Sequence, residues 1–134
     1  LRSIKEICHS MGIKTEFLLS SDIVQEAPEI STLGANELVL ELCLQSGANF
    51  YISGTGCLDF IRPTTFSARG IEFKFQNFSS PVYEQVHGQP FIKQMSILDA
   101  LFNLGFSGTL NLLTDPMLKT PSEYLAEVGA QNLG

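Results

Sequence analysis

The sequence predicts a small α/β fold, a parallel sheet with helices on both faces. One observation is the order of the segments, in which strand patterns alternate with helix patterns as in βαβ units. The segments concerned are residues 13–19, 35–46, 48–53, 63–69, 71–77 and 96–104. The other observation is the strict apolar–polar alternation from Ile71 to Gln76, which is typical of a half-buried strand. With 134 residues, the chain has the length of one domain.

The first part of the chain begins with a helix and a strand. Apolar residues recur at helical spacing over residues 1–11, and Gly12 is a typical helix stop. A strand is expected over residues 13–19, because its apolar residues run on until a polar Ser-Ser-Asp stretch. Residues 22–33 are expected to form a short helical turn and a loop that contains a proline.

The middle of the chain supplies the core of the expected sheet. Apolar residues share one face of a helix over residues 34–45. Residues 49–52, Asn-Phe-Tyr-Ile, predict a short buried strand that runs into a Gly-rich turn. A brief helix is expected at residues 64–69, between a proline and a glycine, before the strand at 71–77.

The last part of the chain begins with a long loop over residues 79–94, and loops of this length are often functional. Ser96 then begins a helix, with Asp99 at its third position, and Gly105 ends it. The run Thr120-Pro121-Ser122-Glu123 is a capping box with proline at the first helical position, so a short helix is expected at residues 124–128.

The composition excludes several classes of protein. Hydrophobic residues make up 44% and charged residues 16%, which disfavours a disordered chain. The net charge of −6 and the lack of a basic stripe speak against nucleic-acid binding. No run of about 18 apolar residues exists, so no membrane insertion is expected. Because the start shows neither a signal peptide nor an initiating Met, we expect the chain to begin inside a longer gene product.

The three cysteines predict a reducing, cytoplasmic location. They form no Cys-x-x-Cys pair and have no histidine at zinc spacing, so neither a metal site nor a disulfide framework is expected. Cys8 and Cys43 share helix faces with apolar residues and are expected to be buried and unreactive. Cys57 lies in the Gly-rich turn and is expected to be the one thiol near solvent, without a nucleophilic role.

The first candidate site is the turn Ser53-Gly54-Thr55-Gly56. It follows a strand of the expected parallel sheet, and ligands bind at such strand ends in open α/β sheets. Successive backbone N–H groups in a Gly-rich turn can hold a phosphate or carboxylate. The spacing matches neither a Walker A loop nor a dinucleotide fingerprint, so a plain tight turn is the alternative. Asp59, just beyond, either caps the next segment or acts as a base.

The second candidate site is the long loop. Tyr83, Gln85 and His87 stand at i, i+2 and i+4, on one side of an extended segment. Their donors and acceptors suit hydroxyl-rich ligands such as sugars. His87 is the best general acid or base, since its ordinary pKa is about 6.5, and a surface histidine is the alternative. Asp99 and Asn103 on the following helix are expected to cap it, with a functional role for Asn103 as the alternative.

The two candidate sites are predicted to form one pocket. Parallel strands place the turn after residue 52 and the loop after residue 78 at the same edge of the sheet. The expected lining is Ser53, Thr55, Asp59, Tyr83, Gln85 and His87. His87 and Asp59 are its expected catalytic residues. In the alternative, the loop packs elsewhere and merely closes the core.

Several short motifs follow one another in a fixed order. They are Ser53-Gly54-Thr55-Gly56, Asp59-Phe60, Phe66, Gly70-Ile71-Glu72-Phe73, Tyr83-x-Gln85, Phe91 and Ser96-Ile97-Leu98-Asp99-x-Leu101-Phe102-Asn103-x-Gly105. In order and spacing they resemble the WbqC-like family of bacterial proteins. The likeness spans residues 1–113 and covers only the C-terminal half of the family's longer members, whose N-terminal half carries a Gln-Pro-x-Tyr motif. Residues 114–134 are expected to be a tail with a short helix, outside the likeness.

The chain departs from the family pattern at three positions. A basic residue usually stands at the position of Leu58, a glycine at that of Cys57 and an arginine at that of Asn36. If the missing cations bind an anionic group of the substrate, this chain binds it more weakly.

The resemblance implies a protein of bacterial surface-polysaccharide (O-antigen, lipopolysaccharide) biosynthesis. The leading hypothesis is a transferase that moves an acyl or aminoacyl group to a nucleotide-linked amino sugar, and the cofactor is left open. The expected substrate-binding residues are Ser53, Gly54, Thr55, Gly56, Tyr83, Gln85 and Asn103. The alternative is a non-catalytic binding or assembly module, a homo-oligomer or a partner of the N-terminal half, which the low charge and abundant Phe favour.

Overall fold

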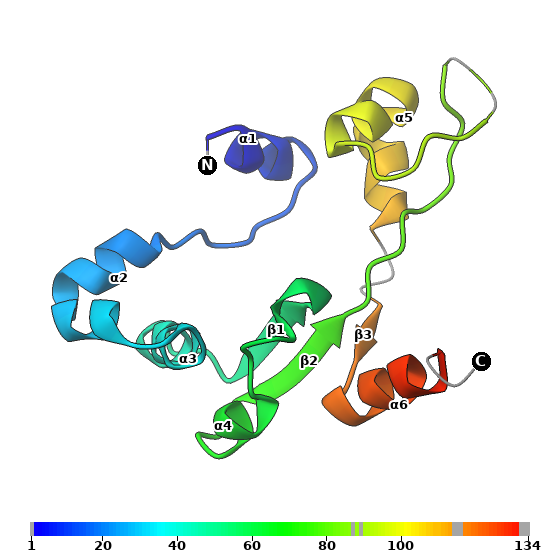
Figure 1. Cartoon of the computed structure of the whole chain (residues 1–134). Coiled ribbons are helices and arrows are strands. Elements are labelled where there is room, and N and C mark those ends of the chain that lie inside the picture. Colours follow the sequence, from blue (N-terminus) through cyan, green and yellow to red (C-terminus); the bar gives the residue numbers. More distant parts are fainter. Residues whose placement is uncertain (1, 87, 89, 114–116, 132–134) are drawn as a thin grey trace. The chain divides into compact units, whose positions relative to one another are not determined.

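The computed structural model of the chain is divided into two compact units (Figure 1). The residues that the structure describes are 2–86, 88, 90–113 and 117–131. We call residues 18–78 with 117–134 the sheet unit, and residues 1–17 with 79–116 the loop unit. The described elements are α1 (Arg2–Ser10), α2 (Ser20–Glu26), η1 (Pro28–Thr32), α3 (Ala35–Gln45), β1 (Phe50–Gly54), η2 (Thr55–Cys57), α4 (Pro63–Ser67), β2 (Glu72–Gln76), α5 (Ile97–Leu112), β3 (Leu118–Lys119) and α6 (Pro121–Gln131).

The sheet unit is built on a three-stranded sheet in the order β1-β2-β3 (Figure 1). β1 and β2 are parallel, and Gly54 lies opposite Gln76 at their C-terminal ends. β3 pairs antiparallel with β2. The predicted small α/β fold is therefore confirmed, with a mixed sheet. Two residues are too few to show a strand period, so the sequence pattern does not predict β3.

Aromatic side chains form the core of this unit. Successive residues of a strand face opposite sides, which puts Tyr51, Phe73 and Phe75 on one face of the sheet. Helices α3, α4 and α6 add Leu40, Cys43, Phe66 and Tyr124 to the same cluster. The fully buried Phe66 ring lies 5.1 Å from the ring of Tyr51 and 5.2 Å from that of Phe73. The opposite face carries Ile52 and Lys74 and is partly exposed, so the helices of this core cover one face.

Most helix boundaries lie where the capping and stop residues of the sequence predict them. α1 ends before Gly12, which has a φ of +73°. The helices expected at residues 34–45 and 64–69 are α3 and α4. Thr120 and Glu123 form the predicted capping box, in which Glu123 Oε2 accepts from the Thr120 backbone N–H at 2.7 Å. The helix that follows, α6, is longer than expected and reaches Gln131.

The strand expected over residues 13–19 is wrong. These residues are irregular until Ser20, where α2 begins. An isolated extended segment is not a stable strand, because its backbone groups need a hydrogen-bonded neighbour, and the described part of the chain pairs no strand with it. Phe17 instead lies beside Lys5 of α1, whose Nζ is 5.7 Å from the centre of its ring.

Gly105 interrupts α5 but does not end the helical segment. Its φ of 69° and ψ of −178° lie outside the helical region, so the predicted break is confirmed. Helical backbone then resumes and continues to Leu112, which the sequence reading missed. Thr109, one turn after the break, is buried and donates its hydroxyl to the Gly105 carbonyl at 2.8 Å.

Candidate functional site

The Gly-rich turn begins where β1 leaves the buried face of the sheet. Ser53 is buried, and its hydroxyl contacts the Cys57 thiol. The thiol donates to the Gly54 carbonyl at 2.9 Å, which closes the single 3₁₀ turn of η2. Thr55 is half-buried, whereas Gly54 and Gly56 are exposed. The turn is thus held from its inner side by Ser53 and Cys57, and its glycines face outward.

The two glycines of this turn stand in open space. Gly54 has a φ of −71°, which any residue adopts, and Gly56 has no positive φ. A Cβ atom built on either glycine would meet nothing within 4 Å. Gly54 is the N-cap of η2, a position that favours glycine, so the alternative of a plain tight turn stays open. Glycine at these positions also leaves the backbone open to close approach by another molecule.

At the core of the sheet unit, burial raises the pKa of two ionisable side chains. Burial raises the pKa of the Tyr51 phenol, an effect that a hydrogen bond with Ser53 partly offsets. Burial also raises the pKa of the Cys43 thiol. Cys43 is buried as predicted, whereas Cys8 is only half-buried, so the prediction of a buried Cys8 is wrong. Its helix, α1, has no buried residue among those described.

The second candidate site is organised by the carboxylate of Asp99. Asp99 Oδ2 accepts a hydrogen bond from the Tyr83 hydroxyl at 2.7 Å and from Gln85 Nε2 at 2.9 Å. The cap of α5 is Ser96, whose hydroxyl accepts from the Leu98 N–H at 3.3 Å. The hydrogen bond to Asp99 raises the pKa of Tyr83, because the carboxylate favours the protonated phenol. Tyr83 therefore remains a hydrogen-bond donor at neutral pH.

Gln85 and Asn103 bind the backbone of the loop. Gln85 is 4% exposed, and its amide donates to the Ile92 carbonyl at 3.1 Å and accepts from the Ile92 N–H at 2.9 Å. Asn103 accepts from the Val86 N–H at 2.7 Å and donates to the Asp99 carbonyl at 2.7 Å. Asn103 thus bridges α5 and the loop. The expectation that it caps the end of the helix is wrong.

The predicted site residues fall in different units. Ser53, Gly54, Thr55, Gly56 and the exposed Asp59 belong to the sheet unit, whereas Tyr83, Gln85 and Asn103 belong to the loop unit. His87 lies outside the described residues. The expected starting geometry is confirmed, because the paired C-terminal ends of β1 and β2 lie at one edge of the sheet. The single pocket that unites both sites stays a prediction.

Comparison with known proteins gives a family. Residues 1–110 match the WbqC-like protein family, which covers both candidate sites. The chain belongs to this family. No curated protein and no solved structure matches it significantly. Among the described residues of this WbqC-like chain, no helix is both long and apolar enough to cross a membrane.

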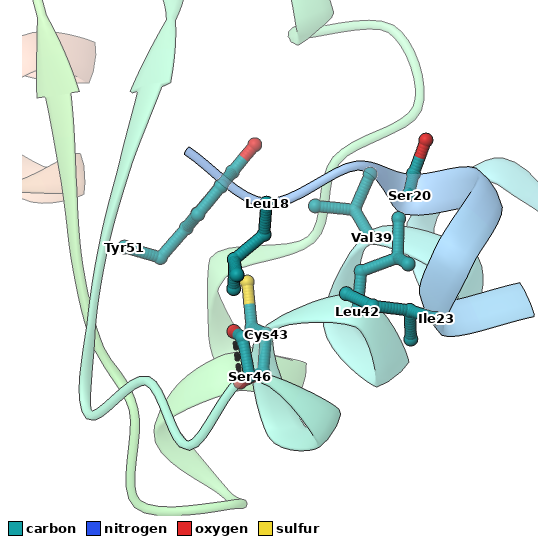
Figure 2. A pocket seen from close by; sticks show the side chains of 8 residues that line it. All are labelled: Leu18, Ser20, Ile23, Val39, Leu42, Cys43, Ser46 and Tyr51. Carbon is teal, nitrogen blue, oxygen red and sulfur yellow. Dashed lines mark hydrogen bonds between the residues drawn. The ribbon is translucent and has the colours of Figure 1, made fainter. Parts of the chain in front are cut away.

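The WbqC-like chain also has an apolar hollow that sequence reasoning missed. It has a volume of about 270 Å³ and lies within the sheet unit (Figure 2). Its lining residues come from α2, α3, β1 and the residues before α2, and they are Leu18, Ser20, Ile23, Val39, Leu42, Cys43, Ser46 and Tyr51. The spacing of Val39, Leu42 and Ser46 on one helix face is the signal that points to it.

Asn36, where the resemblance implies an arginine in the family, has a structural role in this chain. Asn36 is buried at the start of α3, where its Oδ1 accepts from the Arg62 N–H at 2.7 Å and its Nδ2 donates to the Thr65 hydroxyl at 3.1 Å. The Arg62 guanidinium pairs with Glu37. Asn36 therefore ties α3 to the turn before α4.

Proposed function

We propose that this WbqC-like chain takes part in bacterial surface-polysaccharide biosynthesis, in the cytoplasm. The proposed reaction is the transfer of an acyl or aminoacyl group to a nucleotide-linked amino sugar. In that step the sugar amine forms a bond to the acyl carbon, the bond from that carbon to its activating group breaks, and a base takes the amine proton. Family membership supports the polysaccharide role, and the two candidate sites supply the chemistry.

The exposed glycines of the turn carry this proposal. Gly54 and Gly56 are exposed at the C-terminal end of β1, in a conformation and a space that would accept a side chain. A phosphate of the nucleotide would contact the backbone of this turn, where a side chain would obstruct it. Ser53 and Thr55 flank the same contact.

The loop supplies the sugar-binding part of the proposal. Tyr83 presents a phenol that stays protonated, and the loop backbone around it is held by Gln85 and Asn103. Hydroxyl and amide groups of this kind recognise sugars by hydrogen bonding. His87 or Asp59 is the proposed base that takes the amine proton.

A titration with nucleotide sugars tests the binding step. Uridine diphosphate linked to glucosamine should raise the melting temperature of the chain more than uridine diphosphate linked to glucose. Gly54→Ala should leave the melting temperature of the free chain unchanged and weaken binding at least about tenfold, because the added methyl meets the ligand and not the protein. Gly129→Ala, at another open glycine in α6, is the matched control and should bind as the wild type does. Equal binding by Gly54→Ala and the wild type would remove the turn from the site.

Turnover tests the acid–base residues. With an activated acyl donor and the amino-sugar nucleotide, His87→Ala should lower turnover by about 10²–10⁴-fold, as expected for a general base. His9→Ala changes the other histidine of the chain, which is exposed on α1, and should leave turnover unchanged. A loss below about tenfold would reassign His87 to binding.

Exposed apolar side chains favour a second function, a non-catalytic binding or assembly module. Val86 is 95% exposed on the loop and Phe102 is 88% exposed on α5. Such residues mark interaction surfaces when they gather in a patch. Melting that depends on protein concentration without ligand, together with a dimer in light scattering, would support this function, in which a second copy or the N-terminal half covers the surface.

A further inference from the structure

We infer that Asp99 is a positioning residue, which acts through Gln85 to hold the loop backbone at Ile92. Together with Tyr83 and Asn103 these two residues form what we call the Gln85 clasp. The clasp joins the start of α5 to a loop that has no helix or strand among its described residues. Its effect on a ligand rests on the proposed function, whereas the clasp itself does not.

Gln85 is the centre of the clasp. Its side chain pairs with both polar groups of the Ile92 backbone, donating to the carbonyl and accepting from the N–H. Two opposite residues of paired β-strands exchange the same two hydrogen bonds. Here the side-chain amide of Gln85 takes the place of the second strand. The same Nε2 also donates to Asp99 Oδ2 at 2.9 Å. Since Nε2 has two protons, one for Ile92 and one for Asp99, the carboxylate adds to the preference for the orientation of the amide that pairs with Ile92.

Burial makes that orientation important. Gln85 is 4% exposed, and a buried amide that loses a partner has no water to replace it. A flipped amide would point its oxygen at both the Asp99 carboxylate and the Ile92 carbonyl. Asp99 therefore reinforces the orientation of the Gln85 amide that pairs with the Ile92 backbone.

Asn103 holds the same loop at a second point. It lies four residues after Asp99, which places both side chains on one face of α5. Its amide accepts from the Val86 N–H and donates to the Asp99 carbonyl, each at 2.7 Å. The Gly88 N–H donates to the Gln85 carbonyl at 2.8 Å, which adds a turn between the two points.

The sequence predicts that Gln85 and Asn103 contact the substrate directly, whereas the geometry assigns them an indirect role in binding. Their described hydrogen bonds all go to the protein itself, mostly to loop and helix backbone. In the proposed function they act on a sugar through the backbone that they hold. Preorganisation of this kind lowers the entropy cost of binding.

Amide hydrogen exchange on the whole chain tests the clasp. Asp99→Ala should make the Ile92 amide exchange about tenfold faster, the order expected from losing a buried hydrogen bond. Asp99→Asn should recover most of the protection, because its amide oxygen still accepts from Gln85. Tyr83→Phe should leave the Ile92 amide within about twofold of the wild type, since the Gln85–Asp99 bond remains. Asp22→Ala, at an exposed aspartate of α2, is the control.

Two results would overturn the inference. One is unchanged Ile92 exchange in Asp99→Ala. The other is Asp99→Asn exchanging as fast as Asp99→Ala. Amides of β2 report whether each variant is folded, and a variant that unfolds is replaced by Gln85→Leu, for which the same faster exchange at Ile92 supports the inference and unchanged exchange refutes it.

Ligand binding separates the clasp from the proposed function. With uridine diphosphate–glucosamine as the probe, Asp99→Ala should bind at least about fivefold more weakly and Asp99→Asn should recover. Equal binding by all variants would show that the loop does not serve the ligand. If the wild type itself does not bind the probe, the proposed function fails, and the exchange measurements still decide the clasp.

Discussion

The two units of this chain bury different kinds of side chain. The buried residues of the sheet unit are mainly aromatic and aliphatic, among them Phe66, Phe75, Ile71 and Phe73, and its buried polar residues are Asn36 and Ser53. In the loop unit the described buried residues include two polar ones, Gln85 and Thr109, beside Met11 and Ala100. One unit is therefore stabilised mainly by apolar burial, and the other depends more on directed hydrogen bonds.

Apolar burial and directed hydrogen bonds have different consequences, the first mainly for stability and the second mainly for conformation. Apolar burial contributes about 25 cal/mol per Å² and requires no particular direction, so it sets how stable the sheet unit is. A hydrogen bond contributes only about 0.5–1.5 kcal/mol net but requires a defined geometry. The polar contacts of the loop unit therefore matter most for the conformation of the loop, where the ligand is proposed to bind.

The largest effect is expected from Phe66, which contacts Tyr51 and Phe73 and is fully buried. Phe66→Ala should lower the free energy of unfolding by about 3–5 kcal/mol, through lost transfer energy and the cavity left behind. Denaturant unfolding followed by tyrosine fluorescence measures it, since the chain has no Trp. Phe102→Ala, at an exposed position, should change the same quantity by less than about 0.5 kcal/mol. Similar losses in the two variants would contradict the comparison.

A substitution at Gly105 tests how strongly the loop unit depends on its backbone conformation. Gly105→Ala should cost about 1–3 kcal/mol, because a φ of 69° with a ψ of −178° is a region open essentially to glycine alone. Faster amide exchange in residues 106–112 is the expected readout. Gly129→Ala, in a helix with open space around it, should be neutral or stabilising. The strain assignment fails if both variants behave alike.

The capping box of α6 should show a smaller effect that depends on pH. Thr120→Ala should lower the free energy of unfolding by about 1 kcal/mol. Hydrogen bonds from the Thr120 backbone and hydroxyl lower the pKa of Glu123 in the folded chain. Its stabilisation is therefore complete above the unfolded-state pKa of about 4.3 and is lost as pH falls through the lower folded value. Acid unfolding of Glu123→Gln should lack this contribution, and an unchanged acid profile would exclude it.

The smallest effect concerns the titration of Tyr83. The hydrogen bond to Asp99 raises the pKa of this phenol, so Asp99→Asn should lower it toward the ordinary value of about 10. A pH titration of ¹³C-labelled tyrosine by NMR measures the change. Tyr51, whose pKa is raised mainly by burial in the other unit, should titrate as before and serves as the internal reference. A Tyr83 pKa that does not move would remove the Tyr83–Asp99 bond from the clasp.

The sequence predicts the candidate sites only in part. The motif around Asp99 and Asn103 marks them, but the default expectation for such residues is helix capping. Their loop partners stand 14 to 17 residues away along the chain, and no periodicity links them. The apolar hollow is likewise made by three elements whose separate patterns show only that each has a buried face.

By itself the sequence determined the features that depend on a few neighbouring residues. Helical spacing located α1 and α3, Gly12 and Gly105 marked breaks that need a positive φ, and the capping box located α6. Tertiary structure alone decided that residues 13–19 form no strand, that Leu118 and Lys119 do, and that Asp99 faces a loop. A helix satisfies its hydrogen bonds within its own segment, whereas a strand or a half-buried carboxylate needs a partner that only the folded chain brings to it.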